Sequence, residues 1–304
     1  MCDIIIVNMY HLFVFFYQKE KNMPARTANE REERFFNEEH CFKYGDICYV
    51  ENFLHTKENA WVYYHDFYVI DIVTGGTGEH YIEGNSVQIA VGDVFVVPPY
   101  IKHGYFGDEN IEICHIKLKN EFMAKYRDEL HQIEGFNTLF SIEPELRKIY
   151  DKNVYLHLSA HALGDIKKLL EKSNGKDGAG HFLYTAVSML GIIEELCIKM
   201  HDQMSKKHDS GADDSGIIEA LEYIHSHYSE KITIDTLVQI CKTSRPTFNR
   251  HFKRIVGKTP VRYILDCRIN AAKALLAAGN LSKTEIAYRC GFYDVSHMDK
   301  NVSE

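Results

Sequence analysis

The chain has 304 residues, a formal net charge of −8 and a hydrophobic share of 45%. That length suffices for two domains, each with a core of its own, and no segment is of low complexity. None of the eight cysteines belongs to a Cys-x-x-Cys pair. The composition therefore argues against a zinc knuckle or a redox pair, and favours reduced thiols in a cytosolic protein.

The N-terminal segment Ile4–Tyr17 is apolar but short for a membrane span. It lacks the positive start and the small-residue cleavage site of a signal peptide. Two interpretations stay open: residues 1–22 are translated, or translation starts at Met23 and they extend the gene model. In both cases we expect residues 1–39 to form an N-terminal extension.

Residues 40–120 read as short strands. The stretch WVYYHDFYVIDIV is aromatic and β-branched, and turn signals follow at Gly75-Gly76, Gly84-Asn85 and Gly92-Asp93. Ile111–Leu118 supplies a further strand. Many short strands separated by glycine turns predict a barrel or a sandwich.

Residues 121–204 follow a helical period instead. Ala162–Lys172 and Phe182–Met200 place apolar residues three and four apart. The second helix is apolar around much of its girth. Either it packs on its own barrel, or it is buried against a second copy of the chain in a homodimer; the pattern favours neither.

A polar linker, residues 205–215, separates this acidic body from a basic tail. Residues 216–304 carry 13 Lys and Arg against nine Asp and Glu, whereas the remainder carries 22 against 34. A basic segment joined to an acidic body indicates an anionic partner for the tail alone.

The tail predicts a helix-turn-helix. A short helix within residues 233–243 is followed by Ser244, an N-cap, then by RPTFNRHFKRIVG with Pro246 in the first turn and Gly257 as the stop. Phe248, Phe252 and Ile255 share the inner face. The basic residues form the outer face of a recognition helix, where Arg and Asn read base edges and Lys meets phosphate.

The same arrangement recurs after a long helix, TPVRYILDCRINAAKALLAAGN. Ser282 caps a short helix, a turn follows at Gly291-Phe292, and Asp294 caps a new helix. Two such units joined by one helix can enter two successive segments of the major groove.

This tail resembles the AraC/XylS family of bacterial transcription regulators, especially in FNRHFKRIVGKTP, R..AA..LL and IAYRCGFYDVSH. HDFYVIDIVTGGTGEHYIEG and GDVFVVPPYIKH are similar to the cupin-like sensor domain of its sugar-responsive members, rhamnose-type regulators among them. The resemblance covers residues 40–302. It implies a multidomain α and β fold: a cupin-like barrel (double-stranded β-helix) at 40–120, a helical dimerisation segment at 121–204 and an all-α double helix-turn-helix at 216–304.

The resemblance also implies which residues contact DNA: Ser244, Arg245, Pro246, Thr247, Asn249, Arg250, Lys253, Val295, Ser296, His297 and Lys300. Asp299 is an unfavourable charge beside phosphate. The family continues further than DKNVSE, so we expect a truncated second motif. We also expect residues from about Asp294 onward to be frayed, because part of the apolar face that would hold them on Ile286, Cys290 and Phe292 is missing.

Cupins are often metalloenzymes with two His and a Glu on one strand and a third His later. Here Tyr63 and Val69 stand where a His and the Glu would be, which leaves His65 and His103. Two ligands rarely hold a transition metal, so we expect no metal, no cofactor and no catalytic residue. We expect the barrel to bind a ligand, although aromatic residues at period two also suit a plain core. The candidate ligand-binding residues are Trp61, Tyr63, His65, Tyr68, Tyr81 and His103.

The expected function is that of a cytoplasmic, ligand-responsive and sequence-specific regulator of carbohydrate-utilisation genes. Its expected partners are an operator in double-stranded DNA, a small-molecule effector of the sugar class, a second copy of the chain and RNA polymerase, with no membrane. The alternative is a cupin metalloenzyme, or another binding module, whose helical tail docks it to DNA or a partner. The missing His and Glu favour the regulator.

Overall fold

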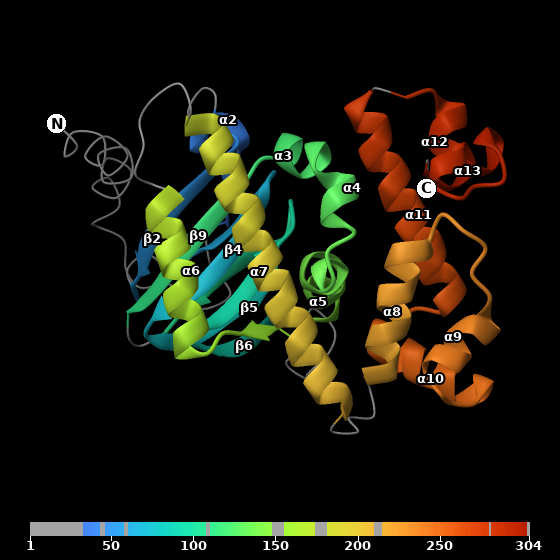
Figure 1. The fold of residues 1–304 in the computed structure, drawn as a ribbon, viewed down its shortest axis with the longest axis horizontal. Helices are drawn as coiled ribbons and strands as arrows, with labels where there is room; N and C mark the ends of the chain where they lie inside the picture. Colours follow the sequence, from blue (N-terminus) through green and yellow to red (C-terminus); the bar gives the residue numbers. More distant parts are fainter. Residues whose placement is uncertain are drawn as a thin grey trace. The chain divides into compact units, whose positions relative to one another are not determined.

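The computed structural model describes residues 33–42, 46–57, 60–107, 110–147, 155–173, 181–209, 215–279 and 281–302. Internal contacts divide the chain into residues 1–33 and 34–304, and the second unit is the subject here. The hydrophobic stretch at 4–17 and Met23 lie outside the described residues. Figure 1 shows a β-rich part, helices that cover it, and a helical C-terminal part.

Two five-stranded sheets form the β-rich part, in the orders β1-β3-β8-β5-β6 and β10-β7-β4-β9-β2. Every strand pair whose register is known is antiparallel. The strands are β1 (Glu33–Phe36), β2 (Cys48–His55), β3 (Val62–His65), β4 (Tyr68–Gly75), β5 (Thr77–Ile82), β6 (Asn85–Ala90), β7 (Asp93–Val97), β8 (His103–Phe106), β9 (Ile111–Leu118) and β10 (Leu156–His157). This is the barrel-type fold that the glycine turns predicted.

The turns follow local chemistry. The β5–β6 hairpin closes through Glu83 and Gly84, both with positive φ, 45° and 94°. Two such residues give the right-handed twist that a two-residue hairpin requires. At Gly76, with φ 76°, an added Cβ would lie 2.0 Å from the carbonyl oxygen of Asn110, so only glycine fits.

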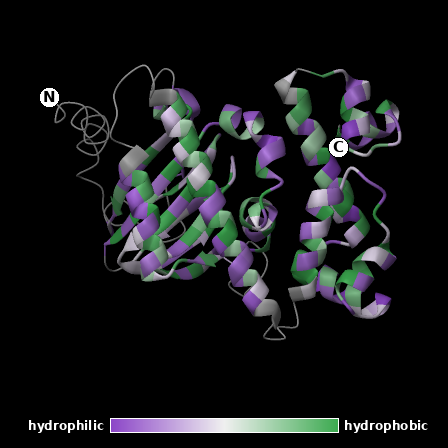
Figure 2. Ribbon diagram, viewed as in Figure 1, coloured by the Kyte–Doolittle hydropathy of each residue, from purple (hydrophilic) through white to green (hydrophobic). Residues whose placement is uncertain are grey.

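The helices are α2 (Glu38–Cys41), α3 (Asn120–Lys125), α4 (Arg127–Leu130), α5 (Glu143–Leu146), α6 (Ala160–Ser173), α7 (His181–Asp209), α8 (Ser215–His227), α9 (Ile234–Ile240), α10 (Arg245–Val256), α11 (Pro260–Ala278), α12 (Lys283–Arg289) and α13 (Val295–Val302), with a π-helical turn, η3 (Thr138–Ile142). Hydrophobic and hydrophilic residues alternate along α6 and α7 in Figure 2, as one buried face requires.

Helices α6 and α7 cover the outer face of the sheet that contains β4, β7 and β9. Ile70, Val94 and Ile116 of that sheet share one hydrophobic core with Ile192 and Leu196 of α7. The interpretation that α7 packs on its own barrel therefore accounts for most of its apolar surface. Leu183 and Val187, on one side of α7, remain 67% and 61% exposed.

Secondary structure crosses three of the expected boundaries. Within the expected extension, β1 joins the sheet next to β3, because Phe36 packs on Tyr63. The region expected to be helical contains β10, whose Leu156 pairs with Val94. The expected linker is helical as far as Asp209, since Lys is a good helix former and nothing before that point stops α7.

Candidate functional site

The interior between the two sheets is polar. Side chains from six strands meet there in a group that we call the barrel cluster: His55, Tyr63, His65, Asp71, His80, His103, Tyr105 and His115. Seven of these residues are at most 7% exposed, and Tyr63 is half-buried with a fully buried hydroxyl group. Burial of polar groups costs more free energy than burial of apolar groups. The number of polar side chains here therefore indicates a role other than packing.

One side of the barrel cluster is fully bonded. Asp71 accepts a 2.6 Å hydrogen bond from the Tyr105 hydroxyl, and its other oxygen lies 2.5 Å from Nδ1 of His115. Nε2 of His115 lies 3.3 Å from Nε2 of His55. Burial alone would raise the pKa of Asp71, but His115 and the hydrogen bonds hold it well below its usual range. Asp71 is therefore a buried carboxylate that fixes its neighbours.

The other side, which we call the unbonded side, keeps buried polar atoms without partners. On this side of the barrel cluster, five buried polar atoms have no hydrogen-bond partner among the described residues: the Tyr63 hydroxyl, Nε2 of His65, Nε2 of His103 and both ring nitrogens of His80. The four side chains converge, because the His103 ring lies 4.3 Å from Tyr63, 5.1 Å from His65 and 5.9 Å from His80 between ring centroids. Orphaned buried groups are rare and costly, so this set suits a polar ligand.

The histidines on this side are neutral near pH 7. Burial, with the nearby His103, lowers the pKa of His65 to about 3. Burial lowers the pKa of His103 to about 4, although Asp71 opposes the shift, and burial keeps that of His80 well below 6.5. A neutral imidazole offers one donor and one acceptor. Backbone carbonyls take the Nδ1 donor of His65 and His103, so each of these rings offers an acceptor to a hydroxyl group, whereas His80 offers both a donor and an acceptor.

The structure brings three of the six predicted ligand-binding residues together: Tyr63, His65 and His103. The other three lie elsewhere. Along β5, His80 and Ile82 are buried on the inner face, so Tyr81 between them points the other way. Tyr68 packs against the outer core shared with α7. Trp61, before β3, stacks under the Arg34 guanidinium at 3.8 Å.

Sequence reasoning missed His55, Asp71, His80, Tyr105 and His115. They are distant in sequence, and the histidines have no ligand-like spacing. The one available signal was local: Asp71 and His115 each stand between two apolar residues in the middle of a strand. A polar residue in the middle of a buried strand is a candidate for an interior site.

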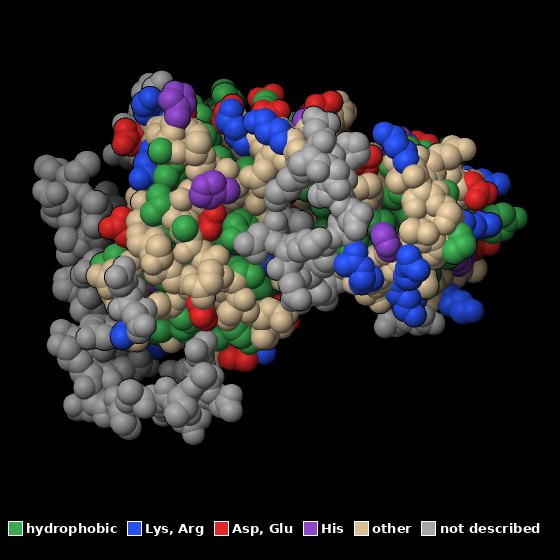
Figure 3. All heavy atoms as spheres, turned by 90° about the horizontal axis from the view of Figure 1, so that it is seen from below, with side chains coloured by type: hydrophobic (Ala, Val, Ile, Leu, Met, Phe, Trp, Pro, Cys, Tyr) green, Lys and Arg blue, Asp and Glu red, His purple; other side chains and the backbone are tan. Residues whose placement is uncertain are grey.

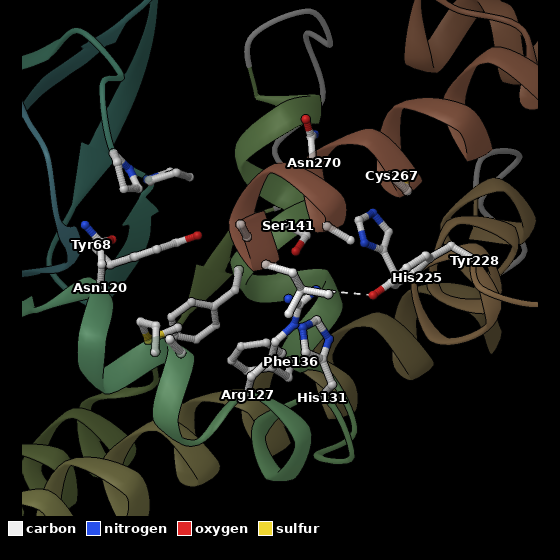
Figure 4. Close-up of a pocket in the computed structure, with 18 of the residues that line it drawn as sticks. Tyr68, Asn120, Arg127, His131, Phe136, Ser141, His225, Tyr228, Cys267 and Asn270 are labelled. Atoms are coloured by element: carbon white, nitrogen blue, oxygen red, sulfur yellow. Dashed lines mark hydrogen bonds between the residues drawn. The ribbon is translucent and has the colours of Figure 1, made fainter. Parts of the chain in front are cut away.

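Tyr68 lines a second hollow, a groove of about 1360 Å³ in Figure 4. Arg127 and Phe136 lie on one side, and His225 and Tyr228 of α8 and the loop after it lie on the other. Nη2 of Arg127 donates a 3.2 Å hydrogen bond to the Tyr228 hydroxyl, drawn as a dashed line. The groove is partly apolar, and the hydrogen bond between Arg127 and Tyr228 lies within it.

The predicted first recognition helix is α10. Ser244 caps it by accepting from the backbone N–H of Thr247, and Gly257 ends it at φ 74°. Phe248, Phe252 and Ile255 are buried beneath it. The predicted DNA-contacting residues on its outer side are exposed, except for half-buried Thr247: Ser244, Arg245, Pro246, Asn249, Arg250 and Lys253. Several Lys and Arg side chains show on the surface of the C-terminal helical region in Figure 3.

The second unit repeats this geometry. Ser282 and Glu285 form a reciprocal capping box at α12, and Oδ1 of Asp294 accepts a 2.7 Å bond from the backbone N–H of His297. Ser296, His297 and Lys300 are exposed on α13, and Val295 is half-buried against the core. Asp299 is paired with Nζ of Lys283 at 2.9 Å, which reduces its repulsion of phosphate.

The premise of the fraying expectation is wrong in this structure. Met298 of α13 is fully buried in one cluster with Ile286, Cys290 and Phe292. The anchoring contacts are therefore present along α13.

Among the described residues, no group of three or more His, Cys, Asp or Glu has the arrangement to hold a metal ion. His65 and His80 each approach His103 edge to face. The geometry therefore offers a polar interior, with imidazoles as hydrogen-bonding groups.

Comparison with known proteins identifies both domains. The model of the AraC-like ligand binding domain matches residues 37–183, and that of a helix-turn-helix domain matches residues 237–303. The HTH-type transcriptional activator RhaS of Escherichia coli (strain K12 / DH10B) is 26% identical over 236 residues, which is 78% of this chain and 81% of that protein. RhaS of Shigella boydii serotype 18 (strain CDC 3083-94 / BS512) gives the same values.

Two solved structures are similar at a lower level. The DNA-binding domain of AdpA, in complex with a target DNA, is 28% identical and covers 29% of this chain and 78% of its own, with a TM-score of 0.28. ToxT from Vibrio cholerae O395, bound to (E)-4-(8-methylnaphthalen-1-yl)but-3-enoic acid, is 15% identical over 85% of this chain and 94% of its own, with a TM-score of 0.31.

A sensor barrel followed by two capped helix-turn-helix units defines a transcription regulator that has a ligand-binding and a DNA-binding part. The chain belongs to the AraC family of such regulators, a family of DNA-binding proteins rather than of enzymes. In the described ranges, no helix has the length and apolar character to cross a membrane.

Proposed function

We propose that this protein regulates carbohydrate-utilisation genes by binding a sugar-like effector inside its barrel. The main support is the unbonded side of the barrel cluster, where Tyr63, His65, His80 and His103 keep buried polar atoms without partners. A polyhydroxylated ligand supplies both donors and acceptors for these atoms. Similarity to RhaS activators supports the carbohydrate class.

The interior also suits the apolar faces of a sugar ring. The Tyr105 and His80 rings are stacked with 4.6 Å between their centroids, and Phe95 lies 4.6 Å from His80. Flat rings beside hydrogen-bonding groups are the usual lining of small-molecule sites. On this proposal Tyr63, His65 and His103 bind the effector together with His80, whereas Trp61, Tyr68 and Tyr81 do not.

We propose that α10 reads the operator through Asn249 and Arg250, with Lys253 and Arg245 at phosphates. Arg pairs with guanine edges and Asn with adenine edges in the major groove. Arg245 lies 3.8 Å from Asp235, and both side chains are exposed, so this weak ion pair leaves Arg245 available. On α13, Ser296, His297 and Lys300 make the second set of contacts, with Val295 beside them.

We propose that the protein acts as a homodimer in the cytoplasm, where its DNA is. Leu183 and Val187 are one turn apart on α7, and Leu169 of α6 is also exposed. A second copy would bury these side chains.

The corresponding division of the chain is a sensor at 40–120, a connector at 121–204 and a DNA-binding part at 216–304. Because the curated relatives are activators, we also propose that the protein contacts RNA polymerase.

Calorimetry of the full chain with a panel of free sugars and sugar acids tests the effector site. We expect at least one of them to bind, and the His103→Gln variant to weaken that binding by about 10- to 100-fold, because a buried hydrogen-bonding ring is lost. His161→Gln on α6 is the matched control, since that side chain is 90% exposed. Equal binding by the wild type and His103→Gln would place the effector elsewhere.

A further inference from the structure

Arg147 enters the barrel from outside the strands. It follows α5, yet its side chain is 1% exposed and its guanidinium carbon lies 5.0 Å from the centroid of the Phe95 ring. Phe95 and Asp71 are paired neighbours on the inner faces of β7 and β4. Arg147 and His80 therefore contact the same ring, and the guanidinium adjoins the unbonded side of the barrel cluster.

The guanidinium is only partly bonded. Nη2 donates a 2.6 Å hydrogen bond to the carbonyl oxygen of Val96. Across the described residues, Nε and Nη1 have no hydrogen-bond partner, and neither have the two carboxyl oxygens of Glu143. Nε of Arg147 and Oε1 of Glu143 are 3.2 Å apart, a distance that counts as an ion pair, but their orientation makes no hydrogen bond. An Arg–carboxylate pair gains most of its energy from aligned N–H donors, so this contact stabilises the guanidinium only weakly.

Among the interior residues that the structure describes, none supplies a full counter-charge to Arg147. Burial raises the pKa of Glu143 to about 7, against the opposing effect of Arg147, so near neutral pH this carboxyl is only partly ionised. Asp71 is already engaged by Tyr105 and His115. The neighbouring His80 and His103 are neutral. A buried cation with unused donors is costly unless an anion reaches it.

We propose that the effector carries a carboxylate which binds to Arg147, and that it is a sugar acid. This rests on the proposed function, because the hydroxyl groups of the same molecule would occupy His65, His80, His103 and Tyr63. The arrangement places a cationic group at one side of the barrel cluster and neutral donors and acceptors at the other. A neutral sugar would leave the Nε and Nη1 donors unpaired, so Arg147 sets specificity for the acid.

The position of Arg147 also gives the bound acid a path to the DNA-binding part. Ile142, just before α5, and Leu146, its last residue, are buried in one hydrophobic core with Phe248 and Phe252 of α10. Glu222 of α8 accepts a 2.8 Å bond from the backbone N–H of Thr138 in η3. A shift of Arg147 toward an anion would thus act on a helix that packs directly against the recognition helix.

The test compares matched pairs that differ only in oxidation at one carbon: galacturonate with galactose, and glucuronate with glucose. Titration calorimetry uses the full chain and four variants. We expect at least one acid to bind the wild type about tenfold or more tighter than its neutral counterpart. Arg147→Met should abolish this preference, Arg147→Lys should keep part of it, and Glu143→Gln should tighten acid binding.

Lys168→Met is the matched control, because it removes one positive charge from an exposed site on α6, and it should keep the preference. The proposal is overturned if no acid binds the wild type, if acid and neutral sugar bind equally, or if the preference survives in Arg147→Met. Arg147→Lys keeps the charge, so it separates loss of the anion site from loss of folding. Neutral sugars that bind the wild type and fail with His103→Gln would leave the barrel effector site standing while Arg147 loses its role.

Discussion

The imidazole rings of His65 and His103 lie edge to face inside the barrel, with 5.1 Å between their centroids. Nδ1 of His65 lies 2.6 Å from the carbonyl oxygen of Phe67, and Nδ1 of His103 lies 3.1 Å from that of Ile101. Each backbone carbonyl accepts from Nδ1–H, which leaves Nε2 of each ring as an acceptor directed away from it. The pair therefore presents two fixed acceptors to the interior.

These two histidines should make the barrel acid-labile. Their folded pKa values, about 3 for His65 and about 4 for His103, lie below the ordinary 6.5, mainly because of burial. Their stabilising contribution is therefore complete above pH 6.5 and is lost as the pH falls toward the folded values. Each should cost about 1.4 kcal/mol per pH unit in that window.

Urea unfolding between pH 7.5 and 5, taken as roughly the range over which histidine titrates, measures this slope. His65→Gln and His103→Gln should each flatten it, whereas exposed His161→Gln should leave it unchanged. Identical slopes for the wild type and both buried variants would show that these rings are not held neutral by the fold.

Arg250→Ala should reduce specific DNA binding. Arg250 is exposed on α10, on the opposite side from buried Phe248 and Phe252. We expect a cost of about 1–3 kcal/mol for the preferred operator and little change for non-specific DNA. Competition binding at fixed salt measures both, with Lys168→Ala as a control for net charge. Equal loss on both kinds of DNA would reduce Arg250 to a phosphate contact.

Met298→Ala should loosen the second helix-turn-helix unit. Met298 is fully buried among Ile286, Cys290 and Phe292. Removal of such a side chain costs about 2–5 kcal/mol. Amide exchange should therefore show protected amides along α13 in the wild type and loss of that protection in the variant, with exposed Ser296→Ala as the control. If α13 exchanges freely in the wild type, the helix is frayed in solution despite these contacts.

Val187→Asp should dissociate the proposed homodimer. Val187 is 61% exposed on α7, and a charge there would be buried without a partner at an interface. Sedimentation of the full chain at tens of micromolar, roughly the range in which modest interfaces associate, should give a dimer for the wild type and a monomer for the variant. Exposed Lys167→Asp on α6 is the control. A monomeric wild type would leave Leu183 and Val187 without this role.

Local chemistry explains what the sequence predicts well. The ends of α10 follow from Ser244 and Gly257, whose capping preferences need no distant partner. The outer position of Asn249 and Arg250 follows from the helical period. Strand turns at Gly76 and Gly92 follow from positive φ. Each of these features depends on residues within a few positions of one another.

The barrel cluster depends instead on closure of the two sheets. His80, on β5, meets Tyr105 and His103 only because β5 pairs with β8, and β8 faces β4 across the interior. Alternation along a strand gives two faces but does not say which is inner. The sequence therefore indicated Tyr81, and not His80, as a ligand-binding residue. Arg147 lies outside the strands altogether, in a segment whose period indicates only a helix.

The most direct test of the central claim is operator binding by the full chain, with and without the effector found by calorimetry, for the wild type and for a Tyr63→Phe, His65→Gln double variant. The operator comes from selection of genomic fragments by the wild type. The account predicts that the effector changes operator affinity several-fold in the wild type, and that the double variant binds the free operator normally but no longer responds. An unchanged response in the double variant would contradict it, because the barrel cluster would then not be the site that controls DNA binding.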